Sequence, residues 1–240
     1  MINDNEIQRD LGWFRVRLGS ITGSKVGDLM KSGRKKEQIF GDTALSYIYQ
    51  VAAERMLNPV FVDDDELFAD YVEQMQVTSK AIRWGQEQED NAKNLLLKIN
   101  NTWEMSEVSS CKHDTIPHFA ASPDAIVYDR EKMMVVEIKS PNPNTFVKYL
   151  SEVRDNETLK AIKPEYYYQM QAEMMCTNTQ GGVFVAYCPW LTKPIHIVPI
   201  SRDEETCKAI EERVVLANEM IEKIISETQN IRSKWKLQER

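Results

Sequence analysis

The sequence predicts an α+β protein, in which helices flank a central mixed β-sheet in an α/β/α-like arrangement. Three observations support this class. Short apolar runs with strand character lie between residues 104 and 139 and again between 183 and 200. Longer segments with apolar residues at helical spacing precede, separate and follow these runs. A length of 240 residues and a hydrophobic content of 42% suit one sizeable core, so we expect a single domain over residues 1–240.

Two helices are predicted near the N-terminus. Thr22 can cap the first, over about residues 23–31, because its hydroxyl can accept a hydrogen bond from the free amides there. Asp42 is expected to cap the second, over about residues 43–57, which stops before Asn58-Pro59. The remaining elements, in chain order, are a helix over about 79–98, strands at 104–110, 117–121, 125–128 and 133–139, a helix over 164–177 that begins at Pro164, strands at 183–188 and 195–200, and a helix over about 203–232.

Charge is distributed unevenly along the chain. The formal net charge of −7 argues against a broadly phosphate-binding surface, because Lys and Arg drive such binding. Much of the negative charge is local, since residues 63–66 form an acidic loop within a polar, acidic segment over 58–77. The loop over residues 32–41 and its flank carry a basic cluster, which consists of Lys31, Arg34, Lys35 and Lys36. This local positive charge keeps a nucleic-acid role open.

The composition excludes several classes of site and location. No apolar run approaches the roughly 18–20 residues of a membrane span, and the polar, acidic N-terminus is not a secretion signal. We therefore expect a cytoplasmic protein with no membrane partner. No C-x-x-C pair is present, which argues against a zinc or iron–sulfur site. Buried free thiols are expected instead at Cys111, Cys176, Cys188 and Cys207.

Two neighbouring strands form a predicted hairpin that carries the candidate chemistry. If its loop spans residues 129–132, Tyr128 pairs with Met133. Counting back from this pair places Asp124 opposite Glu137, and opposite residues project from one face with Cβ atoms about 5 Å apart. A bulge would change this register.

Glu137 and Lys139 lie two residues apart on one strand and therefore share that face, while Val136 and Ile138 point into apolar surroundings. Crowded carboxylates repel each other, and a hard divalent cation removes that repulsion. The lysine can orient or help to deprotonate a water, or stabilise charge on a phosphate. The alternative is a surface Glu–Lys pair beside an unrelated Asp, which Glu-x-Lys alone would favour. The longer pattern Ser122-Pro123-Asp124, twelve residues, Glu137-Ile138-Lys139 favours the metal site.

These motifs resemble a known group of enzymes. Pro123-Asp124 followed by Glu137-x-Lys139 resembles the signature of the PD-(D/E)xK nuclease superfamily. More narrowly, Ser122-Pro123-Asp124 and Glu137-Ile138-Lys139-Ser140-Pro141 resemble the bacteriophage lambda exonuclease-like (YqaJ-type viral recombinase) family. Three further stretches resemble segments of that family in the same order, namely Trp13-x-x-x-Arg17-Leu18-Gly19-x-Ile21-Thr22-Gly23-Ser24, Trp84-Gly85-x-x-x-Glu89-x-x-Ala92 and Tyr166-x-x-Gln169-x-Gln171. This combination is far more specific than any one motif.

The resemblance implies a restriction-endonuclease-like fold, a Mg²⁺ cofactor for which Mn²⁺ could substitute, and a role for each matching residue. The implied metal ligands are Asp124 and Glu137, with the backbone carbonyl of Ile138 as an additional ligand and Glu89 as a ligand or water-orienting carboxylate. Lys139 is implied to assist the nucleophilic water. Gln171 is implied to contact the scissile region, with Gln169 as a nearby accessory. By itself, Glu89 also fits a solvated helix face. Because positions two apart on a helix diverge by about 200°, at most one glutamine can point at the metal, and the resemblance favours Gln171.

The resemblance also assigns Arg17 and Ser24 to the terminal 5′-phosphate of DNA, with Thr22 as an accessory. An independent reason supports this assignment, because free amides and the helix dipole favour an anion at the expected helix N-terminus, and Arg17 can add a bidentate contact. The alternative is an ordinary capped surface helix beside a solvated arginine.

The activity implied by the resemblance is that of a Mg²⁺-dependent deoxyribonuclease, most narrowly a 5′→3′ exonuclease that acts on double-stranded DNA ends and leaves 3′ overhangs for homologous recombination. The family also implies a bacterial, phage- or prophage-encoded protein, a ring-shaped homotrimer threaded by DNA, and a single-strand annealing protein as partner. Two alternatives remain open: an endonuclease or single-strand-specific nuclease of the same superfamily, and a non-catalytic DNA-binding module with this fold.

Two apolar stripes are predicted to be structural. The aromatic and methionine residues over 164–177 could stack on bases, but a helical core stripe is the better interpretation. The apolar seam over 203–232 could form a subunit contact, but packing on the protein's own sheet is favoured.

Overall fold

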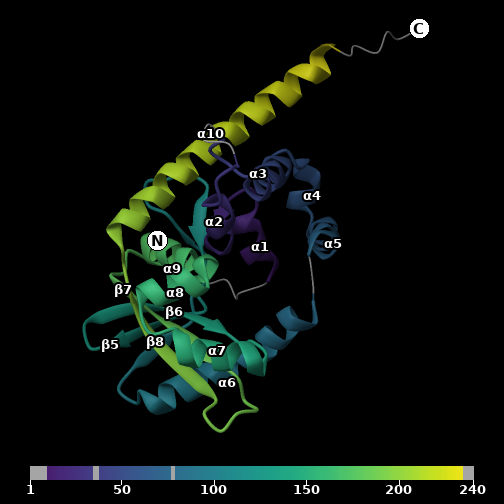
Figure 1. Ribbon diagram of the computed structural model, residues 1–240. Helices are drawn as coiled ribbons and strands as arrows, with labels where there is room; N and C mark the ends of the chain where they lie inside the picture. The colour runs from purple at the N-terminus through teal and green to yellow at the C-terminus, as the bar shows by residue number, and fades with distance from the viewer. Residues whose placement is uncertain (1–9, 35–37, 77–78, 235–240) are drawn as a thin grey trace.

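The computed structural model describes residues 10–34, 38–76 and 79–234 (Figure 1). Lys35 and Lys36 of the predicted basic cluster, and Val77 at the end of the acidic segment, lie outside the described residues. The elements are α1 (Leu11–Arg17), β1 (Ile21–Thr22), α2 (Gly23–Leu29), α3 (Asp42–Arg55), α4 (Pro59–Asp63), α5 (Asp65–Met75), α6 (Lys80–Ile99), β2 (Glu104–Ser106), β3 (Cys111–Lys112), β4 (Phe119–Ala121), β5 (Ala125–Asp129), β6 (Lys132–Lys139), α7 (Pro143–Glu152), α8 (Asn156–Ile162), α9 (Pro164–Thr177), β7 (Gly181–Tyr187), β8 (Ile195–Ser201) and α10 (Glu204–Lys234).

A five-stranded mixed sheet lies at the centre, in the order β2-β5-β6-β7-β8. Its neighbouring strands are antiparallel except for β6 and β7, which run parallel. A second sheet, with the order β1-β4-β3, was not predicted as a separate unit. Strand β1 has only two residues and pairs in parallel with β4, whereas β3 pairs with β4 antiparallel. The predicted α+β class with a mixed sheet between helices is confirmed.

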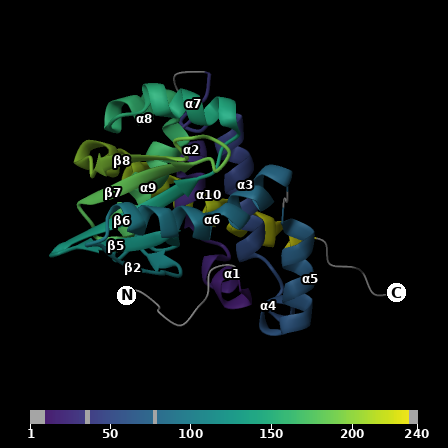
Figure 2. The same cartoon turned by 90° about the horizontal axis from the view of Figure 1, so that it is seen from below.

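Helices cover both faces of the five-stranded sheet (Figures 1 and 2). On one face, α6 contributes Ala92 and Leu96 to a core with Val136 and Ile138 of β6. On the other face, α7, α8 and α9 pack against residues such as Val135. The far side of α9 joins a third core that also contains residues of α2, α3, α10 and the small sheet. Helix α9 is therefore buried from two sides, and its rotation is set by both cores.

The helix starts confirm some sequence predictions and correct others. Ser79 caps α6, since its hydroxyl accepts the amide of Ile82 at 3.2 Å, and Pro164 begins α9. The predicted cap at Asp42 is wrong, because Gly41 occupies the cap position and Asp42 lies in the first turn of α3. Thr22 does precede α2, but its side chain forms no cap hydrogen bond.

Several short helices were missed, and the largest error concerns the acidic segment. Instead of a loop, α4 and α5 fill most of residues 58–77, and Asn58 and Asp64 cap them. Helix α5 buries Phe68 completely, and Arg15 of α1 donates a 2.9 Å hydrogen bond to the carbonyl of Val62. Burial of one aromatic ring together with side-chain caps stabilises helices that are too short to be stable alone. The unpredicted α1, α7 and α8 are likewise capped by Asp10, Asn142 and Asp155.

The two predicted apolar stripes are buried in the protein's own cores. On α9, Tyr167, Met170 and Met174 are fully or almost fully buried. On α10, the seam packs into the third core through Cys207, Ile210, Val214, Ala217 and Ile221. All four cysteines are buried free thiols, as predicted. None of the helices in the described part of the chain combines the length and apolarity that a membrane crossing requires.

Candidate active site

The hairpin between β5 and β6 has the predicted register near its turn. Tyr128 pairs with Met133, and the pairing extends one step further to Asp129 and Lys132, so the loop is two residues shorter than expected. At the other end the ladder stops at Ala125, before the predicted pair of Asp124 with Glu137. The chain bends at Asp124.

Asp124 is held at the end of the hairpin by two backbone contacts. Its amide donates to the carbonyl of Val136 at 3.0 Å, and its Oδ2 accepts the amide of Ile138 at 2.7 Å. These bonds place the carboxylate close enough to Glu137 for the two charges to interact strongly. The two predicted carboxylates are therefore brought together, although by a local departure from the ladder rather than by direct pairing.

Strand β6 directs Glu137 and Lys139 to one face, as its alternation predicts. Val136 and Ile138 enter the opposite core, whereas Glu137 is 1% exposed and forms an ion pair with Nζ of Lys139. The Lys139 ammonium also lies 4.9 Å from the ring centroid of Tyr166. The Lys139 ammonium thus lies between the Glu137 carboxylate and the face of the Tyr166 ring.

Helix α9 supplies two further polar groups to this face, and one of them was not predicted. Oε1 of Gln169 accepts from Nζ of Lys139 at 3.5 Å, and Nε2 of Gln169 donates to Oε1 of Glu173 at 2.9 Å. Glu173 is 1% exposed and lies close to Glu137. The sequence signal that could have revealed it is an acidic residue within the mostly apolar stretch 170–176 of a predicted core helix.

The predicted orientation of the two glutamines is wrong. Gln171 is fully buried, donates to the carbonyl of Ser201 at 3.0 Å and accepts the amide of Asp203 at 2.8 Å. It therefore ties α9 to the junction between β8 and α10 and is directed away from the hairpin. As expected, only one of the two glutamines faces the acidic residues, but that residue is Gln169.

Glu89 reaches the same region from α6. It is 9% exposed, and its Oε1 lies 2.9 Å from Nζ of Lys93. Its charge also acts on the Asp124 carboxyl, which places it near the hairpin. We call Glu89, Asp124, Glu137 and Glu173 the carboxylate cluster.

Burial and mutual repulsion govern the protonation of these groups. Burial raises the pKa of the Asp124 carboxyl well above its usual range, and the charge of Glu137 raises it further. The same two causes raise the pKa of Glu173. Burial opposes the charged form of Lys139, but Glu137 and Asp124 outweigh it and raise the lysine pKa. The ammonium therefore stays protonated and partly compensates the acidic charge.

The donor set fits a hard divalent cation. Glu137 and Glu173 each have one buried oxygen, Oε2, without a hydrogen-bond partner. Such atoms are costly to bury, and a cation that prefers oxygen ligands would satisfy them. In the described part of the chain, no three His, Cys, Asp or Glu groups are already gathered as a metal site. Binding of one cation by several of these carboxylates would therefore require their side chains to move closer together.

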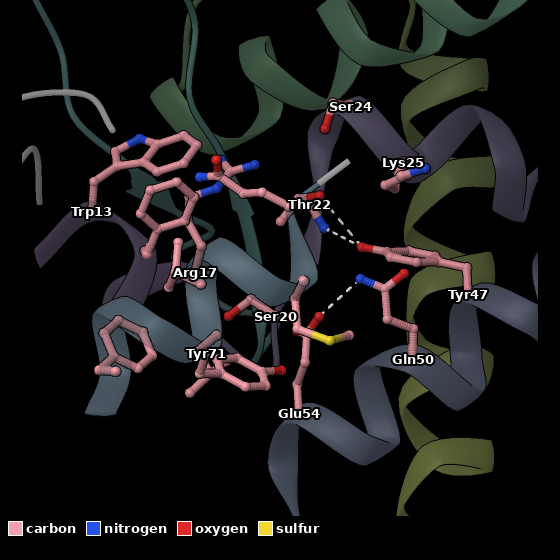
Figure 3. Close-up of a pocket in the computed structure, with 16 residues that line it drawn as sticks. Trp13, Arg17, Ser20, Thr22, Ser24, Lys25, Tyr47, Gln50, Glu54 and Tyr71 are labelled. Atoms are coloured by element: carbon pink, nitrogen blue, oxygen red, sulfur yellow. Dashed lines mark hydrogen bonds between the residues drawn. The ribbon is translucent and has the colours of Figure 1, made fainter. Parts of the chain in front are cut away.

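A cavity of about 260 Å³ lies among the N-terminal helices and is lined by residues of α1, α2, α3 and α5 (Figure 3). Arg17 lines it, donates to Oγ of Ser122 at 2.7 Å and lies 4.2 Å above the ring centroid of Trp13. Through Ser122, the cavity is linked to the segment that carries Asp124. Burial lowers the pKa of Arg17 to about 10, while Tyr47 and Glu173 oppose this change, so the guanidinium remains charged at neutral pH.

Ser24 and Thr22 also line this cavity, but they differ in availability. Ser24 is exposed, whereas the Thr22 hydroxyl lies 3.3 Å from the Tyr47 hydroxyl. The Thr22 amide also donates to Tyr47 at 2.9 Å. Thr22 thus contacts a neighbouring helix rather than capping α2, and of the three predicted anion contacts Arg17 and Ser24 remain.

Comparisons with known proteins identify a family and several similar structures. Residues 12–180 match the sequence profile of the YqaJ-like viral recombinase domain. Two crystal structures of an alkaline exonuclease (LHK-Exo) from Laribacter hongkongensis are similar over 94% of this chain and 99% of theirs. One has 27% identity and a TM-score of 0.74. The other, a complex with dAMP, has 26% identity and a TM-score of 0.75.

A phage-related exonuclease from Haemophilus somnus 129PT shares 16% identity over 87% of this chain and 96% of its own, with a TM-score of 0.60. That likeness concerns the fold alone. No curated protein matches the chain. The neighbours confirm the predicted restriction-endonuclease-like architecture of helices around a mixed sheet.

Proposed function

Because the chain belongs to the YqaJ-like viral recombinase domain family, we propose that it is a divalent-metal-dependent DNA exonuclease. The similarity to the alkaline exonuclease of Laribacter hongkongensis supports nuclease activity. The observation that carries the proposal is the buried Glu137–Lys139 ion pair beside Asp124 and Glu173 at one edge of the sheet. Buried acidic groups that lack a cationic partner destabilise a fold. Their presence here is explained if they bind the metal ion of a hydrolase.

The carboxylate cluster would hold Mg²⁺, or Mn²⁺ in its place, through Asp124 and Glu137, with Glu89 or Glu173 and the Ile138 carbonyl as additional oxygen donors. When bound, the cation supplies Lewis acidity toward the phosphate and lowers the pKa of a coordinated water. Asp124 is already positioned by the Ile138 amide. Lys139 would place a protonated Nζ where it can donate to a phosphate oxygen or orient a water. Gln169 keeps that ammonium in place.

The narrower proposal is 5′→3′ degradation of double-stranded DNA that leaves 3′ overhangs for recombination. Arg17 supports it, because its charged guanidinium lines a cavity that is linked to Asp124 through Ser122. A terminal 5′-phosphate bound by Arg17 and Ser24 would set which end of a strand enters the carboxylate cluster. Thr22 would support this site only indirectly, since its hydroxyl and its backbone amide both contact Tyr47.

The family resemblance also leads us to propose a ring-shaped homotrimer that encloses DNA and a single-strand annealing protein as partner. A ring would keep an acidic chain of net charge −7 on its substrate, because topology replaces part of the ionic attraction. Light scattering of the purified protein tests the trimer directly, and a monomer in solution would contradict it.

Digestion of linear duplex DNA labelled at the 5′ or the 3′ end, with Mg²⁺ and with EDTA, tests the proposed function. The expected result is Mg²⁺-dependent release of mononucleotides from the 5′ end, with a 3′ strand left behind. Cutting of closed circular DNA would favour an endonuclease, and degradation of single strands alone would favour a single-strand-specific enzyme. Binding without hydrolysis across Mg²⁺ and Mn²⁺ would identify a non-catalytic DNA-binding module.

A further inference from the structure

Two tryptophans from distant parts of the chain form a stacked pair at the surface. Trp84 belongs to α6, and Trp190 lies in the turn between β7 and β8. Their ring centroids are 4.5 Å apart and their planes differ by 17°. Trp190 is 62% exposed, so one face of its indole packs on Trp84 while much of the ring meets solvent. The proposed hydrolysis makes no use of this exposed aromatic surface.

The pair lies at the edge of the sheet that carries the carboxylate cluster. Strands β6 and β7 run parallel, with Lys139 beside Ala186, and Trp190 follows the end of β7 by three residues. Trp84 precedes Glu89 by five residues on α6, which is about 7.5 Å along the helix axis. Helix α6, which crosses the sheet in Figure 2, therefore carries Trp84 of the tryptophan pair and Glu89 of the carboxylate cluster.

Gly85 leaves an open strip of helix between the pair and the cluster. A Cβ atom built at Gly85 meets no atom within 4 Å, so nothing in the protein itself requires glycine there. Glycine in the middle of a helix is less favourable than alanine. Gly85 is four residues before Glu89 and shares its helix face. The bare backbone thus offers room for a ligand that passes from Trp84 toward Glu89.

The charge around the pair favours a polyanion. Lys80, one turn before Trp84, and Lys193, three residues after Trp190, are exposed. Neither forms an ion pair with another residue in the described part of the chain. The exposed Arg83 and Glu87 are four residues apart on α6, where opposite charges offset each other. The charged residues within four positions of either tryptophan therefore carry a net positive charge, in a chain whose net charge is −7.

We propose that Trp190, supported from behind by Trp84, stacks on an unpaired nucleobase of a single DNA strand whose neighbouring phosphate lies at the carboxylate cluster. This inference rests on the proposed nuclease function and names a substrate subsite for it. Every base presents a flat face to an indole, so the stacking holds a strand without reading its sequence. Lys80 and Lys193 attract the flanking phosphates, and Gly85 lets the strand approach the helix backbone.

Binding of a fluorescein-labelled oligothymidylate in EDTA, measured by fluorescence anisotropy, tests the subsite without hydrolysis. Trp190→Ala should weaken binding roughly 5- to 150-fold, the range expected for removal of one stacking aromatic. Trp190→Phe should retain most of the affinity, because it keeps an aromatic face. Tyr49→Ala, which removes a 58% exposed aromatic residue from α3, serves as the matched control and should bind like the unmodified protein.

Gly85→Leu provides a second variant that does not depend on the stability of the tryptophan pair. Its side chain enters open space and leucine favours helix, so the melting temperature should stay the same or rise while oligothymidylate binding weakens.

Parallel assays of linear duplex DNA with Mg²⁺ separate the two proposals. If the unmodified protein degrades DNA but Trp190→Ala and Gly85→Leu bind as it does, the subsite is overturned and the nuclease stands. If the unmodified protein neither binds nor degrades DNA, both proposals fail.

Discussion

The backbone amide of Ile138 donates a 2.7 Å hydrogen bond to Oδ2 of Asp124. This bond joins the C-terminal end of β6 to the residue before β5 and holds Asp124 near Glu137. Burial and the Glu137 charge raise the pKa of Asp124, so the contact stabilises an anion that its surroundings disfavour. The carboxylate is therefore positioned before any cation binds.

Asp124→Asn separates the charge of this residue from its position. The amide oxygen can still accept from Ile138, so the fold should be retained, and the metal-free protein should melt at the same or a higher temperature because a buried charge is gone. Hydrolysis of DNA with Mg²⁺ should fall by about 100-fold or more, since a hard-cation ligand is lost. The measurement is the initial rate over a Mg²⁺ titration. A rate close to that of the unmodified protein would exclude Asp124 as a ligand.

Lys139→Met should affect both activity and stability. Its loss leaves Glu137, which is 1% exposed, without its cationic partner, and this should cost about 3–5 kcal/mol of unfolding free energy. Activity should fall by roughly 10²- to 10⁴-fold. Urea unfolding in EDTA measures the first effect. The double variant Lys139→Met with Glu137→Gln is the control, because it should regain most of the stability while remaining inactive. Failure to regain stability would argue against the pairing.

Gln169→Ala and Gln171→Ala should have opposite consequences. Gln169 contacts Lys139 and Glu173, so its removal should slow hydrolysis with little loss of stability. Gln171 satisfies buried backbone groups of Ser201 and Asp203, so its removal should cost about 1–3 kcal/mol while the rate per folded molecule stays unchanged. Urea titrations and single-turnover rates distinguish the two. The reverse pattern would restore the assignment of Gln171 to the scissile region.

Arg17→Ala tests the polarity of digestion. The charged guanidinium at the cavity should favour ends that carry a 5′-phosphate, so the variant should lose this preference more than it loses the hydrolytic step. Rates on matched duplexes with 5′-phosphate and 5′-hydroxyl ends give the ratio. Equal rates on both ends by the unmodified protein would remove the assignment.

Glu173→Gln should flatten the pH dependence of stability in EDTA. Because burial and Glu137 raise the pKa of Glu173 in the folded state, the native protein binds this proton more tightly than the unfolded chain does. Stability from this group is full below the ordinary carboxyl pKa and is lost as pH rises toward the raised value. The variant should therefore be more stable than the unmodified protein at pH 8. Glu152→Gln, an exposed change on α7, is the control. An unchanged pH profile in Glu173→Gln would show that Glu173 is ionised throughout.

Much of the hairpin could be predicted because its information is local. Alternation along β6 separates Val136 and Ile138 from Glu137 and Lys139, and this follows from strand geometry alone. The same reasoning failed at residues 58–77, where acidic composition suggested a loop. There, burial of Phe68 against α1 stabilises helices whose sequence alone is only weakly helical.

The sequence alone determined the mixed α+β class, the strand register near Tyr128 and Met133, and the presence of two carboxylates and a lysine on one strand pair, because these depend on periodicity and short spacings. Tertiary structure decided that Gln169 faces the carboxylate cluster and Gln171 does not, and that Glu173 lies beside Glu137. The physical reason is that α9 is packed between two cores, and only their combined shape fixes its rotation.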